Sequence, residues 1–204
     1  PCSSCINESV LVVASHLSAK VYDLAIVEHV ATVRASRHSD NFITCVCYES
    51  VSESVFAGFD NGMVRVWRIC SSAGADCHAW QAHTACVKAI GVVGISQDFP
   101  PEISLITVCS DGTISTWKCH LGKSNINVSN FNTIETNIGQ VSHATISAEN
   151  PKLPLGGSRL AILVSLKSII FVSFLGDQSK VTRFQRTRPA KKRHRKEVQV
   201  VSKD

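Results

Sequence analysis

The sequence predicts an all-β protein built from repeated four-stranded units, and three observations lead to this prediction. Two stretches share one pattern, an apolar run, a turn rich in Asp, Asn and Gly, an alternating stretch and then Trp: FAGFDNGMVRVW at 56–67 and ITVCSDGTISTW at 106–117. Apolar runs of strand length recur along the chain between turn residues. Signals for helices are nearly absent, which favours the all-β class.

The repeat is best aligned on an aromatic residue near the end of each unit. The four anchors lie 45, 50 and 54 residues apart, at Tyr22, Trp67, Trp117 and Phe171. Such a spacing between similar segments is typical of repeat folds, in which each unit buries its faces only against its neighbours.

Two strands form a hairpin around the turn of each unit. The first is an apolar run, as expected of a strand buried on both faces, at 10–14, 55–58, 105–108 and 160–164. The second alternates between two faces, as in 63–67. The pairs Asn61, Gly62 and Asp111, Gly112 lie between the strands, where a tight turn needs positive φ.

Further strands complete the unit. They are expected before the hairpins at 42–48, 87–95 and 141–146, and after them at 26–33 and 77–81. A four-stranded unit about every 45 residues, ending in an aromatic residue after an Asp-Gly turn, is typical of a β-propeller blade.

One unit resembles a WD-repeat blade. His83, Asp111 and Trp117 occupy the places at which a carboxylate orients an imidazole and a Ser or Thr hydroxyl satisfies the indole N–H. Cys109 takes the usual place of that Ser, two residues before the Asp. The second unit carries a less complete set, His38, Asn61 and Trp67. The resemblance implies a WD-repeat β-propeller, with about four blades here as the C-terminal part of a seven-bladed ring.

Composition and charge divide the chain into two parts. Its 204 residues suffice for one domain with a core, and 44 % are hydrophobic. The net charge is +5, yet eight basic residues and no acid lie between Arg183 and Lys196. We expect a partial propeller at 1–180 and a basic, disordered tail at 181–204. No apolar run is long enough to span a membrane.

The candidate chemical sites favour structural roles. His83 and Asp111 beside Ser110 suggest a hydrolase dyad, but the blade pattern explains their spacing and no nucleophile elbow is present. The nine cysteines are odd in number and scattered, as expected of buried thiols in a reducing compartment. Cys45 and Cys47 share a strand face but lack two further ligands for a metal. We expect no enzyme, no cofactor and no metal.

The basic tail has its own candidate functions. It fits a nuclear-import address or a contact with RNA phosphates, and a merely solubilising role is the alternative. The residues concerned are Arg183, Arg186, Arg188, Lys191, Lys192, Arg193, Arg195 and Lys196.

Three stretches resemble the p21-activated-kinase-interacting WD-repeat family of ribosome-assembly factors: WQAHTACVK at 80–88, SLITVCSDGTISTWK at 104–118 and IETNIGQVSHATIS at 134–147. Residues 148–182 depart from that family. The resemblance implies a non-catalytic scaffold in nucleolar large-ribosomal-subunit assembly, which could also restrain a p21-activated kinase.

The same resemblance implies how partners would bind. Proteins would bind the propeller face and its loops, and pre-ribosomal RNA would bind the tail. The candidate loops are 36–41, 60–62, 82–86 and 110–112. The alternative is a cytoplasmic WD-repeat adaptor, either a substrate receptor of a ubiquitin ligase or a subunit of a trafficking complex.

Overall fold

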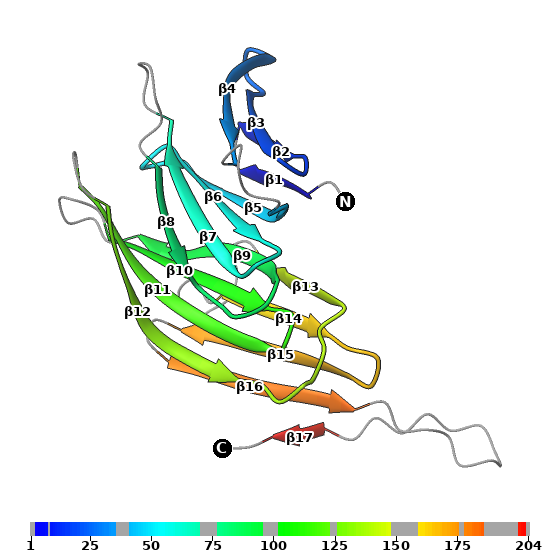
Figure 1. The fold of residues 1–204 in the computed structure, drawn as a ribbon. Helices are drawn as coiled ribbons and strands as arrows, with labels where there is room; N and C mark the ends of the chain where they lie inside the picture. The colour runs from blue at the N-terminus through cyan, green and yellow to red at the C-terminus, as the bar shows by residue number, and fades with distance from the viewer. Residues whose placement is uncertain are drawn as a thin grey trace.

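The computed structural model contains four antiparallel β-sheets stacked in chain order (Figure 1). It describes residues 3–7, 9–35, 41–69, 77–95, 102–122, 126–147, 159–175, 178–185 and 200–202. These residues form strands, turns and bends, and none of them is helical. The all-β prediction is confirmed.

Each sheet is a meander of consecutive strands. The first sheet consists of β1 (Ser3–Asn7), β2 (Val10–Ala14), β3 (Ser18–Asp23) and β4 (Glu28–Arg34). The second consists of β5 (Ile43–Glu49), β6 (Ser54–Phe59), β7 (Met63–Arg68) and β8 (Cys77–Gln81). The third consists of β9 (Val87–Ile95), β10 (Glu102–Cys109), β11 (Thr113–Leu121) and β12 (Ile126–Glu135). The fourth has five strands, β13 (His143–Ile146), β14 (Arg159–Val164), β15 (Ser168–Leu175), β16 (Gln178–Gln185) and β17 (Val200–Ser202).

The stacking is propeller-like. The first strands of successive sheets contact one another, β1 with β5, β5 with β9 and β9 with β13, so these strands lie on the inner side of the stack. One apolar cluster lies between each pair of neighbouring sheets. Each sheet therefore buries its faces against its neighbours, as the repeat predicts.

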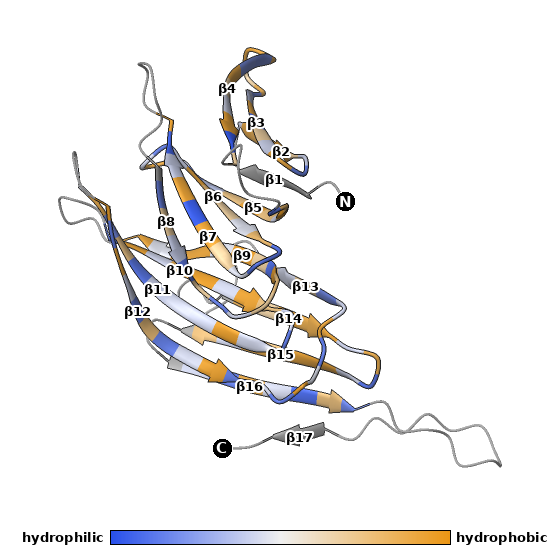
Figure 2. Cartoon of the chain, viewed as in Figure 1, coloured by the Kyte–Doolittle hydropathy of each residue, from blue (hydrophilic) through white to orange (hydrophobic). Residues whose placement is uncertain are grey.

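Burial along the strands follows the number of neighbouring sheets. Every residue of β6 is buried, because the second sheet has a neighbour on both faces. In β2 and β14 buried side chains alternate with less buried ones, because the two end sheets have one neighbour each. Hydrophobic and hydrophilic residues accordingly alternate along many strands in Figure 2.

The anchor predicted for the fourth unit is wrong. Phe171 faces away from the third sheet, whereas Val172 is fully buried against it. Trp117 lies three residues after Ile114, which closes the hairpin with Val108. In the fourth sheet the closing pair ends at Ile169, so the equivalent position is Val172. The segment between the closing pair is one residue shorter in the fourth sheet, 165–168 against 109–113 in the third, and this shifts the alternation of buried and exposed side chains by one position.

The fourth sheet extends past the expected boundary at residue 181. Strand β16 continues to Gln185 because Val181 and the residues after it pair with β15. Residues 200–202 then add β17 to the outer edge of β16 (Figure 1). The rest of the predicted tail, residues 186–199 and 203–204, lies outside the described residues.

Two of the outermost strands carry β-bulges. In β4 the register shifts so that Val30 has no partner in β3, and in β12 the same happens at Phe131 opposite β11. Both side chains are exposed, Val30 to 54 % and Phe131 to 46 %. The ammonium of Lys118 lies 4.9 Å from the centre of the Phe131 ring. The bulges fall beside the anchors Tyr22 and Trp117, at the same place in two sheets.

Candidate functional site

A network of hydrogen bonds, which we call the latch, links strands β10 and β11 of the third sheet to the loop that precedes β9. His83 Nε2 lies 2.7 Å from Thr107 Oγ1, and the indole N–H of Trp117 donates to the same oxygen at 2.9 Å. All three side chains are buried. One hydroxyl thus satisfies both an imidazole and an indole.

The hydroxyl of the latch is the feature that sequence comparison missed. We expected it two residues before Asp111, where Cys109 stands, but Thr107 supplies it from two positions earlier on the same face of β10. The signal that could have identified Thr107 is its place as a polar residue within the apolar run ITVC at 106–109. Thr107 is fully buried and lies opposite Ser115, whose carbonyl oxygen is 3.4 Å from the hydroxyl oxygen.

Asp111 shapes the turn beside the latch. Its Oδ1 accepts the backbone N–H of Thr113 at 2.8 Å. Asn61 Oδ1 accepts the N–H of Met63 in the same way at 3.1 Å. The two turns are therefore alike, and each polar side chain stabilises the turn that joins its hairpin.

Electrostatics keep the imidazole of the latch neutral. Burial lowers the pKa of His83, and the charge of Asp111 and the contact with Thr107 oppose this only in part. Burial alone would raise the pKa of Asp111, but hydrogen bonds from Thr113 and Cys109 together with His83 hold it below its usual value. At neutral pH the pair is therefore an aspartate beside a neutral histidine, and Nε2 of that histidine can accept the Thr107 proton.

The second sheet lacks the hydroxyl. Ala57 lies opposite Arg65, in the register position that Thr107 takes opposite Ser115. Trp67 is nevertheless buried, within the apolar cluster between the first and second sheets. His38, the remaining predicted member, lies outside the described residues. Apolar packing therefore holds Trp67 in place in the second sheet, whereas Trp117 in the third sheet is held by the latch.

Backbone hydrogen bonds bring the predicted loops together at one end of the stack. Asp60 N–H donates to Phe42 O at 3.1 Å, and His83 N–H donates to Gly62 O at 3.0 Å. Ser110 N–H donates to Cys86 O at 2.8 Å. Loops 60–62, 82–86 and 110–112 thus form one continuous surface, which we call the turn ridge together with residues 16–17, 41–42 and 165–167. Most of the predicted loop 36–41 lies outside the described residues.

Two glycines allow the loops of the ridge to approach so closely. Gly62 has φ +84°, and a Cβ there would lie 2.0 Å from the carbonyl oxygen of His83. Gly112 has φ +93°, and its Cβ would lie 2.6 Å from Cγ2 of Ile138. Both turns therefore require glycine, as the sequence predicts.

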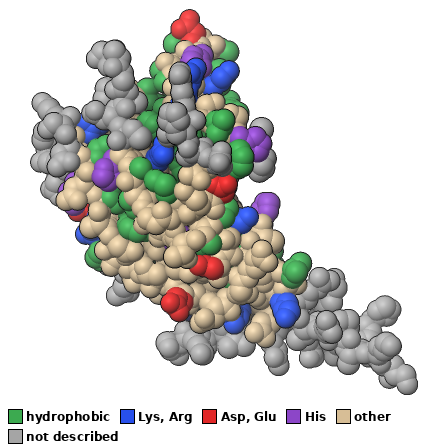
Figure 3. Space-filling view, in the orientation of Figure 1, with side chains coloured by type: hydrophobic (Ala, Val, Ile, Leu, Met, Phe, Trp, Pro, Cys, Tyr) green, Lys and Arg blue, Asp and Glu red, His purple; other side chains and the backbone are tan. Residues whose placement is uncertain are grey.

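The turn ridge exposes large apolar side chains. Leu17 is 52 %, Phe42 44 % and Leu166 91 % exposed. The rings of His16 and Phe42 pack edge to face, with centroids 5.1 Å apart. In contrast, Figure 3 shows few hydrophobic side chains over β11, β12 and β16. The ridge thus carries the apolar groups that a protein partner could cover.

Arg183 is part of a sheet. It lies in β16, and its Nη2 donates to the carbonyl oxygen of Thr136 at 2.5 Å. Thr136 in turn donates its hydroxyl to Gly112 O at 2.7 Å. This arginine therefore links the fourth sheet to the third. The other seven basic residues of the predicted tail lie outside the described residues.

The described cysteines pack as the sequence suggests. Cys45, Cys109 and Cys119 are buried thiols, and Cys86 is partly buried. Cys45 and Cys47 both face the apolar cluster between the second and third sheets. In the described part of the chain, no three His, Cys, Asp or Glu side chains form a group that could hold a metal. No helix within the described ranges is long and apolar enough to cross a membrane.

Comparison with known proteins supports the fold. No protein-family model matches the sequence, and no curated protein matches it. The crystal structure of Chaetomium thermophilum Raptor, a WD40/HEAT protein, is similar, with a TM-score of 0.62 and 14 % identity. The fold is propeller-like. The match covers 86 % of this chain but 15 % of that Raptor chain, so it concerns architecture alone.

Proposed function

We propose that this chain is a non-catalytic WD-repeat scaffold whose turn ridge binds other proteins. The observation that carries the proposal is the ridge itself, where backbone hydrogen bonds join loops 60–62, 82–86 and 110–112 and where Leu17, Phe42 and Leu166 are exposed. A rigid stack of sheets that presents adjacent loops is the usual way in which repeat folds create a binding surface.

The same residues that suggest catalysis support a structural role instead. His83 Nε2 contacts Thr107 and is buried, so its base function is used within the latch.

A pocket between the third and fourth sheets is too small for a substrate. It is lined by Ser104, Phe131 and Phe174 among others, and its volume of about 40 Å³ has room for little more than water.

Nucleolar ribosome assembly is the process we assign to the scaffold. The support is the sequence resemblance of the stretches 80–88, 104–118 and 134–147 and the basic run that begins at Arg183. Seven blades are usual in the WD-repeat superfamily that the chain resembles, so three further sheets would complete such a ring. Restraint of a p21-activated kinase would be a second role of the same surface.

Affinity purification of the tagged chain tests the binding proposal. We expect ribosome-assembly factors to be recovered, and Phe42→Ser with Leu17→Ser to reduce their recovery. The matched control is Val51→Ser. The side chain of Val51 is 70 % exposed and lies in the β5–β6 turn, at the opposite end of the strands from the ridge. Recovery of ubiquitin-ligase or coat subunits would favour the cytoplasmic adaptor, and equal losses for both variants would contradict the ridge.

Localisation tests the basic segment separately. Arg183 is better kept, because it bonds to Thr136 O within the fold. The informative variant replaces by Gln the seven remaining basic residues, Arg186, Arg188, Lys191, Lys192, Arg193, Arg195 and Lys196. We expect the unaltered chain to accumulate in the nucleolus and the variant to be absent from it. Unchanged localisation of the variant would refute a role of the basic segment in nucleolar localisation.

A further inference from the structure

Strand β16 lies fourth from the inner side of the stack, so its far edge faces outward however many sheets the complete ring contains. β16 pairs with β15 at eight consecutive positions without a register shift, whereas β4 and β12 each contain a shift. β8 is regular as well but pairs at only five positions. Among the described outer strands, β16 thus presents the longest regular series of outward N–H and C=O groups.

Contacts on both faces hold β16 in position. On one face, Arg183 donates through Nη2 to the carbonyl oxygen of Thr136, which follows β12. On the other face, the rings of Phe184 and Phe171 pack edge to face with centroids 5.3 Å apart. These contacts and the ladder with β15 fix the backbone of β16, so its outer edge is formed before any further strand docks on it.

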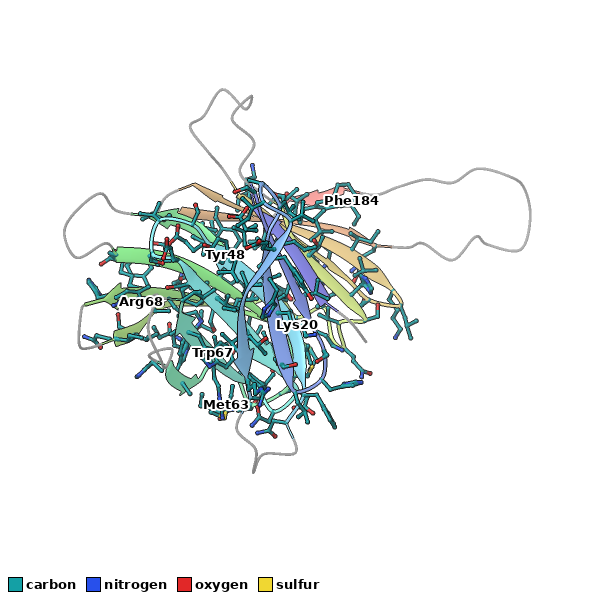
Figure 4. All side chains as sticks on the ribbon, turned by 90° about the horizontal axis from the view of Figure 1, so that it is seen from above. Lys20, Tyr48, Met63, Trp67, Arg68 and Phe184 are labelled. Carbon is teal, nitrogen blue, oxygen red and sulfur yellow. The ribbon has the colours of Figure 1, made fainter. Side chains whose placement is uncertain are left out.

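One strand already lies on this edge. β17 runs antiparallel to β16 and pairs with it at three positions, Thr182 with Ser202, Arg183 with Val201 and Phe184 with Val200. Figure 4 shows Phe184 beside the arrow of β17. Within the described part of the chain, residues 178–181 of β16 have no strand on their outer side. β17 therefore covers only part of a longer edge.

The chemistry of the edge indicates what kind of strand fits it. The segment EVQVVS at 197–202, which contains β17, has three valines and neither glycine nor proline, as is typical of a strand. Lys180 lies on the uncovered part of β16 and is exposed. Since opposite charges favour each other across a strand pair, an acidic residue opposite Lys180 would strengthen the contact. In the register of β17, that position lies two residues after Ser202.

We propose that the outer edge of β16 binds an extended segment of another protein, and that β17 occupies part of this site within the chain itself. The partner segment runs antiparallel to β16, is rich in β-branched residues and carries an acidic residue opposite Lys180. A partner that pairs along the whole edge forms more backbone hydrogen bonds than β17 does with its three pairs, and it therefore displaces β17. This site is additional to the turn ridge and does not rest on it.

Amide hydrogen exchange of the full chain, followed by NMR, tests whether β17 covers the edge. The variant Val200→Pro with Val201→Pro removes two consecutive N–H groups, one of which is directed to β16 because these groups alternate along a strand. We expect the outward amides among residues 182–184 to exchange about tenfold faster in this variant. The matched control, Thr187→Pro with Ala190→Pro, lies outside β17 and should leave their exchange unchanged.

A peptide tests whether the edge binds a separate strand. The probe is the amidated, fluorescein-labelled peptide EVQVVSKD, residues 197–204, whose last aspartate lies opposite Lys180 in the register of β17. A segment of the same chain acts at an effective concentration on the order of 1 mM, so about tenfold protection by β17 corresponds to a dissociation constant of about 0.1 mM for the probe. We expect fluorescence anisotropy to give this value for the proline variant and about tenfold weaker binding to the unaltered chain, where β17 competes.

Two altered probes identify the mode of binding. A probe with Val200→Pro and Val201→Pro should not bind, because it cannot complete the ladder. A probe with Asp204→Lys should bind about threefold more weakly, because it places a second cation opposite Lys180. Bound to the proline variant, the unaltered probe should slow the exchange of residues 182–184 again, which locates it on β16.

Equal exchange in the unaltered chain and the proline variant would overturn the proposal, and so would a proline variant that does not bind the probe or that shows protection on β8 instead of β16. If the proline variant does not fold, as judged by circular dichroism, Val200→Gly with Val201→Gly is the second variant, because glycine weakens a strand without removing an N–H group. Partner recovery with Leu17→Ser and Phe42→Ser is a separate measurement, so failure of this inference and failure of the turn ridge can be told apart.

Discussion

The indole nitrogen of Trp117 donates a hydrogen bond to the hydroxyl of Thr107 across the β10–β11 hairpin, at 2.9 Å. The same oxygen lies 2.7 Å from the imidazole of His83. Replacing Thr107 by Val keeps the side-chain shape and leaves both buried ring nitrogens without this partner. We expect the free energy of unfolding to fall by about 2–4 kcal/mol, measured by denaturant titration.

The control for this change is Thr116→Val on the neighbouring strand. Its hydroxyl donates to Asn132 O at 3.3 Å near the surface, where water can replace the bond. We expect a loss below about 1 kcal/mol. Equal losses for the two variants would show that Thr107 holds no special place in the blade.

The two turn glycines differ from a third glycine in what surrounds them. Gly62, Gly112 and Gly139 all have positive φ, but a Cβ at Gly139 would meet nothing within 4 Å. Gly139→Ala should therefore lower the free energy of unfolding by about 1–2 kcal/mol, which is the cost of the positive φ alone. Gly62→Ala and Gly112→Ala should cost about 1–3 kcal/mol more, because the neighbouring chain must move. Thermal unfolding of the three variants, compared side by side, decides this.

The latch also predicts a pH dependence. The pKa of His83 is lowered from 6.5 in the folded chain, so the unfolded chain takes up a proton first as the pH falls. The contribution of neutral His83 to the free energy of unfolding is thus fully present above pH 6.5 and declines as the pH falls from there towards the pKa of the folded chain. The fall in unfolding free energy below pH 6.5 should be smaller in His83→Gln. An unchanged slope in the variant would rule out His83 as its source.

The buried thiols should be chemically inert in the folded protein. Burial raises the pKa of Cys45 and of Cys119 to about 12, and the charge of Glu102 adds to the effect at Cys119. At neutral pH almost no thiolate forms at either site. We expect iodoacetamide to modify Cys86 before these two, and all three at similar rates in urea, as followed by mass spectrometry. Rapid labelling of Cys119 without denaturant would contradict the packing of β11.

Local signals in the sequence were sufficient for the hairpins and their turns, but the outer strands β12 and β16 and the terminal strands β1 and β17 were not predicted. Asn61 with Gly62 and Asp111 with Gly112 specify tight turns through their own side chains and φ angles, so the hairpins around them could be predicted without knowledge of the fold. The apolar runs beside them predicted burial on both faces, and β6 confirms this.

Features that depend on register could not be obtained in the same way. An alignment of the repeats favours Phe171 as the anchor because it is aromatic, but the shorter connection before β15 places Val172 at the anchor position. Thr107 was missed because its role depends on which residue it faces across the hairpin and on His83 from the preceding loop. Both errors concern contacts between segments, which residue spacing alone does not determine.

Stacked sheets of this kind have an outward border of backbone amides and carbonyls that could recruit foreign strands and seed aggregates. The displaced residues Val30 and Phe131 interrupt that border on β4 and β12. Their exposed side chains stand where an incoming strand would need a regular ladder. The irregularities at the rim of this protein therefore hinder pairing with other chains, and we expect deletion of the extra residue in either strand to promote aggregation.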